Sequence, residues 1–150
     1  MDLILWRHAD AEDGTPDAER KLTPKGEKQA RRVADWLKEQ LPDEYVVLVS
    51  PARRTRQTAQ ALTKDLELVE AVGTGASPKG VLQAAGWPDR NGVVIVVGHQ
   101  PTLGQTVARA LTGRDEGWSL RKGALWWLRS RDGEVSVRAV IGPDSLKRKD

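Results

Sequence analysis

The sequence predicts a three-layer α/β protein, in which a mostly parallel central sheet lies between layers of helices. Three short apolar runs carry this prediction, at residues 3–7, 45–49 and 93–97. Runs rich in Val, Ile and Leu that end in polar, turn-forming residues are typical of strands buried on both faces. A segment with helix signals follows each run, and 150 residues suffice for one compact domain with a substantial core.

The first expected strand, at 3–7, leads into a polar loop over 9–22 that is rich in Asp and Glu. We expect a helix to begin at Thr23 and Pro24, where the sequence carries a helix-start signal. The apolar residues that follow recur at the spacing of one helix face. They are Ala30, Val33, Ala34, Leu37 and Leu41.

The second expected strand, at 45–49, ends at Ser50. Ser50 is a candidate helix cap, and Pro51 fits the first helical position because its missing N–H is not needed there. We therefore expect a helix over 51–64.

The second half of the chain predicts smaller elements and a closing hairpin. The hairpin turn is expected at Arg131-Asp132-Gly133, because Asp-Gly favours tight turns, and residues 144–150 are expected to form a charged, frayed tail. The other expected elements are a short strand near 67–70, a Gly/Ser/Pro loop, a small helix near 78–85, the strand 93–97, a helix from Thr102 to about Thr112, and hairpin strands at 125–128 and 135–140.

Composition limits the function classes. The absence of Cys excludes a disulfide framework, and two His without Cys argue against a zinc site. A net charge of +3 and a pI near 9.4 invite a nucleic-acid hypothesis, but the basic residues are scattered among 21 acidic ones and form no aromatic-basic face. Too few apolar residues precede Arg7 for a signal peptide, and no segment is apolar enough to span a membrane. We expect a cytoplasmic protein with no nucleic-acid or membrane partner.

Both histidines of the chain stand directly behind expected strands. His8 ends the run that starts at Leu3, and His99 ends the run that starts at Val93. Ligands of open α/β sheets bind outside the carboxyl ends of the strands. Since histidine changes protonation near neutral pH, two imidazoles over one crevice indicate acid, base or nucleophile chemistry.

Arginines accompany the same strand ends. Arg7 precedes His8, and Arg53, Arg54 and Arg56 follow the strand 45–49. Arginine suits bidentate recognition of phosphate, and a helix N-terminus adds positive charge. These residues predict a pocket for a multiply charged anion, although Arg53 and Arg56 are interpreted as part of a solvated helix face.

Four segments of the chain follow one another in a familiar order. They read LWRHA at 5–9, RKLTPKG at 20–26, SPARRTRQTA at 50–59 and VGHQP at 97–101. Together they resemble the histidine phosphatase superfamily and, among its branches, the short SixA-type phosphohistidine phosphatases. The resemblance runs from Leu3 to the strand near 135–140 and implies a phosphoglycerate mutase-like fold in one domain, 1–150. The superfamily signature has glycine where this chain has Ala9.

The resemblance implies a role for each matching residue. His8 would be the nucleophile that forms a phosphohistidine intermediate, which water then cleaves. Arg7, Arg54 and His99 would surround the phosphoryl group and stabilise its charge, with Arg54 matching the arginine of the S-P-x-x-R pattern. Arg20 would lie at the pocket rim and contact substrate, with a surface arginine as the alternative. No metal and no cofactor are expected, because the arginines supply the positive charge.

The proton donor to the leaving group is the least defined residue. The wider family supplies an acidic residue after the third strand, and Glu70 is the candidate here, with a solvated loop carboxylate as the alternative interpretation. Imidazole leaves phosphorus more readily than an alkoxide, since it can be protonated near neutral pH. This favours phosphohistidine over phosphate esters as the substrate.

Three functions remain open on the sequence alone. The first is removal of phosphate from phosphohistidine in a protein partner, such as a phosphorelay domain or a phosphocarrier, and the lack of a large lid-forming insertion favours it. The second is a phosphomonoesterase acting on a small phosphorylated metabolite such as a sugar phosphate or nucleotide. The third is a non-catalytic phosphate-binding module, against which the set of Arg7, His8, Arg54 and His99 argues.

The chain has six Trp and no Phe. Core packing is expected for Trp6 and Trp36, and for Trp126 or Trp127. Trp87 and Trp118 lie in expected loops. Two roles remain open for them, packing against the core or lining a substrate entrance.

Overall fold

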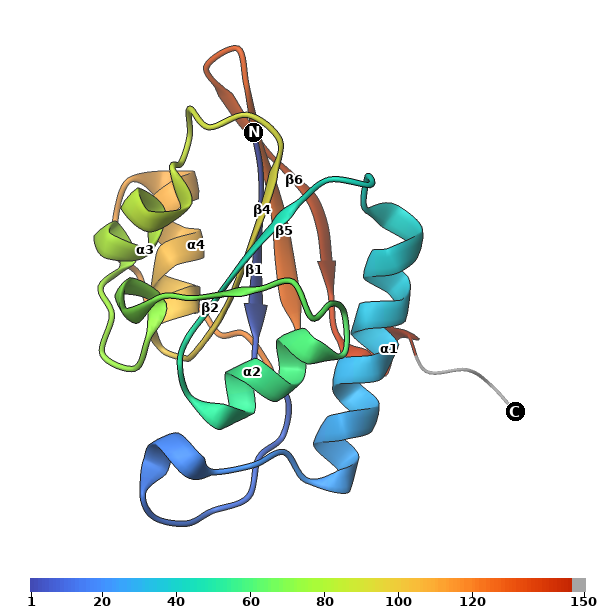
Figure 1. Cartoon of the computed structure of the whole chain (residues 1–150). Helices are drawn as coiled ribbons and strands as arrows, with labels where there is room; N and C mark the ends of the chain where they lie inside the picture. The colour runs from blue at the N-terminus through green and yellow to red at the C-terminus, as the bar shows by residue number, and fades with distance from the viewer. Residues whose placement is uncertain (147–150) are drawn as a thin grey trace.

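The computed structural model describes residues 1–146 as one six-stranded sheet between two layers of helices (Figure 1). The three-layer α/β fold expected from the sequence is confirmed. The strands are β1 (Asp2–Arg7), β2 (Val46–Val49), β3 (Glu67–Leu68), β4 (Val93–Gly98), β5 (Leu125–Arg131) and β6 (Glu134–Ile141). The helices are α1 (Pro24–Gln40), α2 (Arg53–Gln60), α3 (Pro78–Ala85) and α4 (Thr102–Thr112), with short 3-10 turns η1 (Asp17–Glu19), η2 (Glu70–Val72) and η3 (Pro143–Leu146).

The strand order is β3-β2-β4-β1-β5-β6. The first four strands are parallel, and β5 pairs with β1 in the antiparallel direction. The hairpin of β5 and β6 turns at Asp132 and Gly133, as the sequence predicts, and both residues have positive φ. The carboxyl ends of β1, β2 and β4 therefore lie at one edge of the sheet, next to the loop that joins β1 to α1 (Figure 1).

The two faces of the sheet are covered by different helices. Ile4 and Trp6 of β1 pack on the face of α1 and α2. Leu3 and Leu5 of the same strand pack on the face of α3 and α4. All four side chains are fully buried. Because both faces are covered, the central strands have no polar side, and this explains their continuous apolar sequence.

The N-terminus of α1 is fixed by two features of its sequence. The hydroxyl of Thr23 accepts a hydrogen bond from the backbone N–H of Gly26, and Pro24 occupies the first turn, as expected. A β-carbon at Gly26 would collide with the backbone oxygen of Asp10. Only glycine therefore lets this helix pack directly against the chain that leaves β1.

Three expected helix and strand boundaries were wrong, and one of them is the end of the strand predicted at 125–128, which continues to Arg131. The helix predicted over 51–64 begins at Arg53 and ends at Gln60, with Ala52 rather than Ser50 as its N-cap. The strand predicted near 67–70 is limited to Glu67–Leu68, because the chain turns into η2 at Glu70.

Residues 144–146 do not form the frayed tail expected from the sequence. Residues 143–146 form η3, and Leu146 packs against the core on the side of α1. The expectation of a frayed segment from 144 is thus wrong for 144–146. The remainder, 147–150, lies outside the described residues.

The tryptophans mostly serve the core. Trp6 and Trp127 are buried, and Trp36 meets Trp127 edge-on with ring centroids 6.0 Å apart. Trp87 and Trp118 both pack, half-buried, against the core beneath α3 and α4. These contacts assign both Trp87 and Trp118 to core packing. Over residues 1–146, no helix combines the length and apolar character needed to cross a membrane.

Candidate functional site

The two histidines meet at the carboxyl edge of the sheet, as their positions in the sequence predict. β1 and β4 are parallel neighbours in which Arg7 pairs with Gly98, so His8 and His99 follow the strands at the same level. Their ring centroids are 5.5 Å apart, and the residues are only 7% and 6% exposed. The structure thus brings both imidazoles into one site.

A pocket of about 410 Å³ opens over these rings, and we call it the histidine pocket. Its ionisable side chains are two imidazoles and four cations, so it is strongly suited to an anion. The residues that line it are Arg7, His8, Arg20, Arg54, Thr74, Gly75, Ala76, His99, Gln100, Pro101, Thr102, Gln105 and Lys122.

One ring nitrogen of His8 is committed to the backbone. Nδ1 lies 2.7 Å from the carbonyl oxygen of Ala9, and because a carbonyl only accepts, Nδ1 carries the proton. The remaining nitrogen, Nε2, is then unprotonated and has no hydrogen-bond partner among residues 1–146. A neutral imidazole held in this tautomer presents a lone pair, as a nucleophile requires.

Ala9 fits the place where the superfamily signature has glycine. Its side chain is fully buried beside Leu22 and Ala30, and its φ is not positive. Its backbone N–H donates to the hydroxyl of Thr58 on α2, at 3.1 Å. The backbone at this position therefore accepts a methyl group without strain.

His99 has partners at both ring nitrogens. The guanidinium of Arg54 lies 3.4 Å from Nδ1, and since arginine only donates, Nδ1 is the acceptor. The proton of the neutral ring is then on Nε2, which donates to the hydroxyl of Ser50 at 2.7 Å. Ser50, expected as a helix cap, is thus a hydrogen-bond partner of His99, and its hydroxyl also accepts from the backbone N–H of Ala52 at 3.4 Å.

The surroundings of both histidines favour the neutral form. Burial, above all, lowers the pKa of His8 to about 4, and the charges of Arg54 and Arg7 contribute in the same direction, whereas the hydrogen bond to Ala9 opposes it. Burial is also the main cause that lowers the pKa of His99 to about 3, with Arg54 again contributing. Both rings are therefore uncharged at neutral pH.

Two arginines retain unused donors beside the rings. Arg7 donates from Nη1 to the carbonyl of Leu120 at 2.8 Å. The Nε atoms of Arg7 and Arg54 are buried and have no partner within residues 1–146. Buried donors without partners are costly, so an anion that accepts from them would stabilise the site.

Asp17, in the loop after β1, holds Arg54 in place. Arg54 donates from Nη1 to the backbone oxygen of Asp17 at 2.9 Å and from Nη2 to its carboxylate at 3.1 Å. Arg20 donates to the other carboxylate oxygen at 3.0 Å. The hydrogen bond from Arg20 is the largest cause that lowers the pKa of Asp17. One carboxylate therefore joins the two arginines at the rim.

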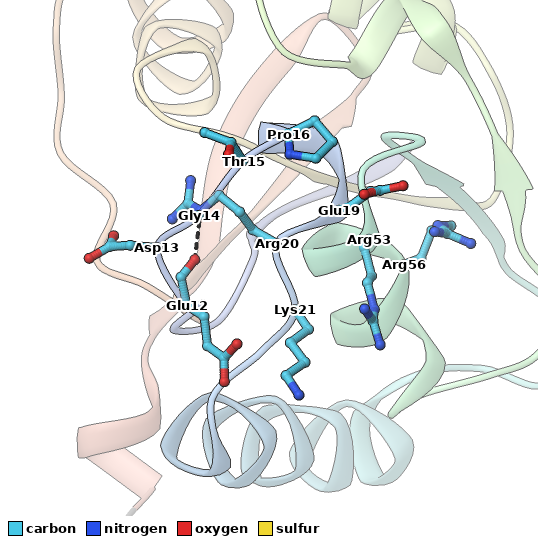
Figure 2. A pocket seen from close by; sticks show the side chains of 10 residues that line it. All are labelled: Glu12, Asp13, Gly14, Thr15, Pro16, Glu19, Arg20, Lys21, Arg53 and Arg56. Carbon is cyan, nitrogen blue, oxygen red and sulfur yellow. Dashed lines mark hydrogen bonds between the residues drawn. The ribbon is translucent and has the colours of Figure 1, made fainter.

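The structure separates the remaining sequence-predicted residues from the histidine pocket, with one exception. Arg20 does line it, as expected. Glu70 is exposed on η2 and does not line it, although Thr74, Gly75 and Ala76 from the same segment do. Arg53 and Arg56 line a different hollow with Glu12 and Lys21 (Figure 2).

Among the residues that sequence reasoning missed are Ser50, Asp17 and Lys122. Ser50 lies in the quoted motif but was assigned to a helix cap, and Asp17 lies in the acidic loop with nothing local to distinguish it. Lys122 lines the histidine pocket and pairs with Asp10 at 2.9 Å. Within residues 1–146 no cluster of His, Cys, Asp or Glu is arranged to hold a metal ion.

Comparison with known proteins agrees with this geometry. Residues 3–73 match the histidine phosphatase superfamily (branch 1). An uncharacterized protein of Picosynechococcus is 35% identical over 93% of this chain and 90% of its own. The phosphohistidine phosphatase SixA of Escherichia coli is 34% identical, over 75% of this chain and 76% of its own. A structure of the protein histidine phosphatase SixA complexed with tungstate superposes with a TM-score of 0.85 at 26% identity, covering 98% of this chain and 100% of that one. The chain therefore belongs to the histidine phosphatase superfamily, in its SixA-type branch.

Proposed function

We propose that this phosphatase removes the phosphoryl group from phosphohistidine in a protein, through a covalent intermediate on His8. The observation that carries the proposal is that His8, whose Nδ1 is bonded to the Ala9 carbonyl and whose Nε2 has no partner among residues 1–146, lines a pocket together with Arg7, Arg54 and His99. The similarity to SixA proteins, whose names state this substrate, supports the choice of phosphohistidine.

The first step transfers the phosphoryl group to the enzyme. The lone pair of His8 Nε2 forms a bond to phosphorus while the bond from phosphorus to the substrate nitrogen breaks. That nitrogen keeps the electron pair, and when its ring carries a proton on the other nitrogen the substrate leaves as neutral imidazole. The Ala9 carbonyl, 2.7 Å from Nδ1, stabilises the positive charge that His8 acquires.

The second step restores the enzyme. A water oxygen forms a bond to phosphorus, and the bond from phosphorus to His8 Nε2 breaks with its electron pair returning to the ring. Dihydrogen phosphate leaves, and His8 is again neutral with its proton on Nδ1. Dividing one displacement into two in this way is the usual advantage of a covalent intermediate.

Arg7, Arg54 and His99 are proposed to stabilise the phosphoryl group in both steps. The unpartnered Nε donors of the two arginines are available to its oxygens. Fixed positive charge in a partly desolvated pocket is worth most where charge develops in the transition state. Arg20, held at the rim by Asp17, is proposed to contact the substrate from the loop side.

The same lining supports phosphohistidine over phosphate esters. The ionisable groups of the histidine pocket are cations and neutral imidazoles, and Glu70, the carboxylate proposed as proton donor from the sequence, is exposed outside it. An ester needs a donor for its alkoxide, whereas a protonated phosphohistidine carries its own proton. We therefore propose that phosphohistidine hydrolysis proceeds without Glu70.

Steady-state assays test the substrate. Wild-type enzyme should hydrolyse a phosphohistidine peptide with a much higher kcat/KM than a sugar phosphate or nucleotide, and Glu70→Gln should leave phosphohistidine hydrolysis nearly unchanged. Higher kcat/KM on the esters, together with a large loss in Glu70→Gln on both substrates, would establish the phosphomonoesterase instead.

The proposal also includes metal independence. Because Arg7 and Arg54 provide the positive charge, activity should persist after dialysis against excess EDTA. Activity that is lost in EDTA and restored by added Mg²⁺ or Zn²⁺ would contradict it.

A further inference from the structure

A second hollow adjoins the histidine pocket, and we call it the basic groove. It has a volume of about 690 Å³ and shares Arg7 and Lys122 with the histidine pocket. Its walls come from the start of α1, from residues 119–126, and from the end of β6 with η3. A chain bound in this groove would run directly up to the histidines.

The charge of the basic groove is strongly positive. Arg7, Lys25, Arg121 and Lys122 line it, against the single carboxylate of Asp144. Lys122 is paired with Asp10, a residue outside the lining. Lys25 and Arg121 are exposed, and neither forms an ion pair with another of residues 1–146. Their charges are therefore available to a bound partner.

The groove also offers apolar surface between these charges. Trp126 is half-buried, and Val140 on the edge strand β6 is 52% exposed. Sites that bind a peptide segment commonly combine an aromatic side chain and aliphatic surface with charged residues around them.

The hollow on the loop side differs in its charge (Figure 2). It has a volume of about 630 Å³ and meets the histidine pocket through Arg20. Its four cations face three carboxylates, and the charged residues are Glu12, Asp13, Glu19, Arg20, Lys21, Arg53 and Arg56. The basic groove, with four cations and one carboxylate in its lining, therefore has the larger surplus of positive charge.

We propose that the basic groove binds an acidic segment of the protein substrate, next to its phosphohistidine in sequence. This inference rests on the proposed function and adds to it the kind of protein that the enzyme selects. Carboxylates of the segment would pair with Lys25 and Arg121 while the phosphohistidine enters the histidine pocket. Complementary charge of this kind affects mainly encounter and selectivity, so it should appear in KM rather than in kcat.

Matched charge reversals test the groove. The test variant is Lys25→Glu with Arg121→Glu, and the control is Lys21→Glu with Arg53→Glu, which makes the same change in the loop-side hollow. All four side chains are exposed, so both variants are expected to fold, and thermal unfolding checks this. The substrates are two synthetic peptides phosphorylated on histidine by phosphoramidate, one flanked by Asp and Glu and one by Ser and Asn, together with phosphoimidazole.

The proposal predicts a selective loss. The test variant should raise KM for the acidic peptide by roughly tenfold, with kcat retained, while the neutral peptide and phosphoimidazole change by less than about twofold. The control variant should leave the preference for the acidic peptide intact. Equal KM values of the two peptides with wild-type enzyme would overturn the proposal that the basic groove binds an acidic segment. An equal rise of KM for the acidic peptide in the test and control variants would also overturn it.

Direct binding separates this inference from the proposed function. The unphosphorylated acidic peptide, labelled for fluorescence anisotropy, should bind wild type and the control variant more tightly than the test variant. If wild type hydrolyses none of the phosphohistidine substrates, the proposed function fails. The anisotropy result still decides whether the basic groove binds the acidic peptide. Equal binding to the two double variants would reject it.

Discussion

His8 and His99 are the same side chain in nearly equivalent places, yet their hydrogen bonds differ. Both follow neighbouring parallel strands, both are buried, and in both burial lowers the pKa. Among residues 1–146, His8 bonds through Nδ1 alone, to a backbone carbonyl. His99 contacts Ser50 through one nitrogen and Arg54 through the other. In the roles proposed here, hydrogen-bond partners, rather than burial or position, distinguish the nucleophile His8 from the stabilising residue His99.

Replacing each histidine in turn should give the largest difference. His8→Gln should lower kcat by roughly 10,000-fold or more, because nothing else in the pocket supplies the attacking nitrogen. His99→Gln should lower it by about 100- to 1,000-fold, the scale of one lost transition-state donor. Single-turnover rates on a phosphohistidine peptide measure both. Equal losses would remove the distinction between the two rings.

Arg54 connects His99 with the loop after β1, and its removal should have the next largest effect. Arg54→Ala should lower kcat by about 100-fold, since it removes charge next to the phosphoryl group. Arg53→Ala, one residue earlier and exposed on the same helix, is the matched control and should change kcat little. A larger loss in Arg53→Ala would show that the wrong arginine is placed in the pocket.

The shared low pKa of the histidines predicts loss of stability in acid. Unfolded histidine has a pKa near 6.5, whereas His8 titrates near 4 and His99 near 3. Between these values the unfolded chain binds more protons, so the free energy of unfolding falls as the pH drops below 6.5, by at most about 1.4 kcal/mol per pH unit for each histidine. Urea unfolding at pH 7 and pH 5 measures this. His99→Gln should lose less stability than wild type over this interval, and an identical loss would contradict the low pKa of His99.

Ser50 offers the smallest and most specific change. Ser50→Ala removes the acceptor of the His99 Nε2 proton and should lower kcat by about fivefold, the scale of one neutral hydrogen bond. Because Ser50 acts through His99, its removal in the His99→Gln background should have little further effect. An unchanged fivefold loss in that double variant would show that Ser50 acts elsewhere.

The sequence predicts the frame of the site because that frame follows local rules. Strands buried on both faces appear as continuous apolar runs, and parallel strands deliver the residues behind them to one edge. The positions of His8, Arg7 and His99 could therefore be predicted. The resemblance to the family distinguished Arg54 from Arg53, which periodicity alone does not do.

The sequence predicts the hydrogen bonds of the site poorly, because they join distant residues. The partner of His99, Ser50, is 49 positions away, and Asp17 reaches Arg54 across 37 positions. Ser50 satisfies the rule for a helix cap equally well, and only the start of α2 at Arg53 shows that the cap lies elsewhere. Exposure likewise cannot be predicted for a lone loop carboxylate, so Glu70 was a reasonable candidate until its position was known.

The most direct test of this account is to trap the phosphoenzyme. Wild-type enzyme mixed with a ³²P-labelled phosphohistidine peptide and quenched in alkali should retain a label that is stable in base and released in acid, as expected of phosphohistidine. His99→Gln should accumulate the same label, since it keeps the nucleophile, and His8→Gln should retain none. Label at the wild-type level in His8→Gln would contradict the assignment of His8 as the nucleophile.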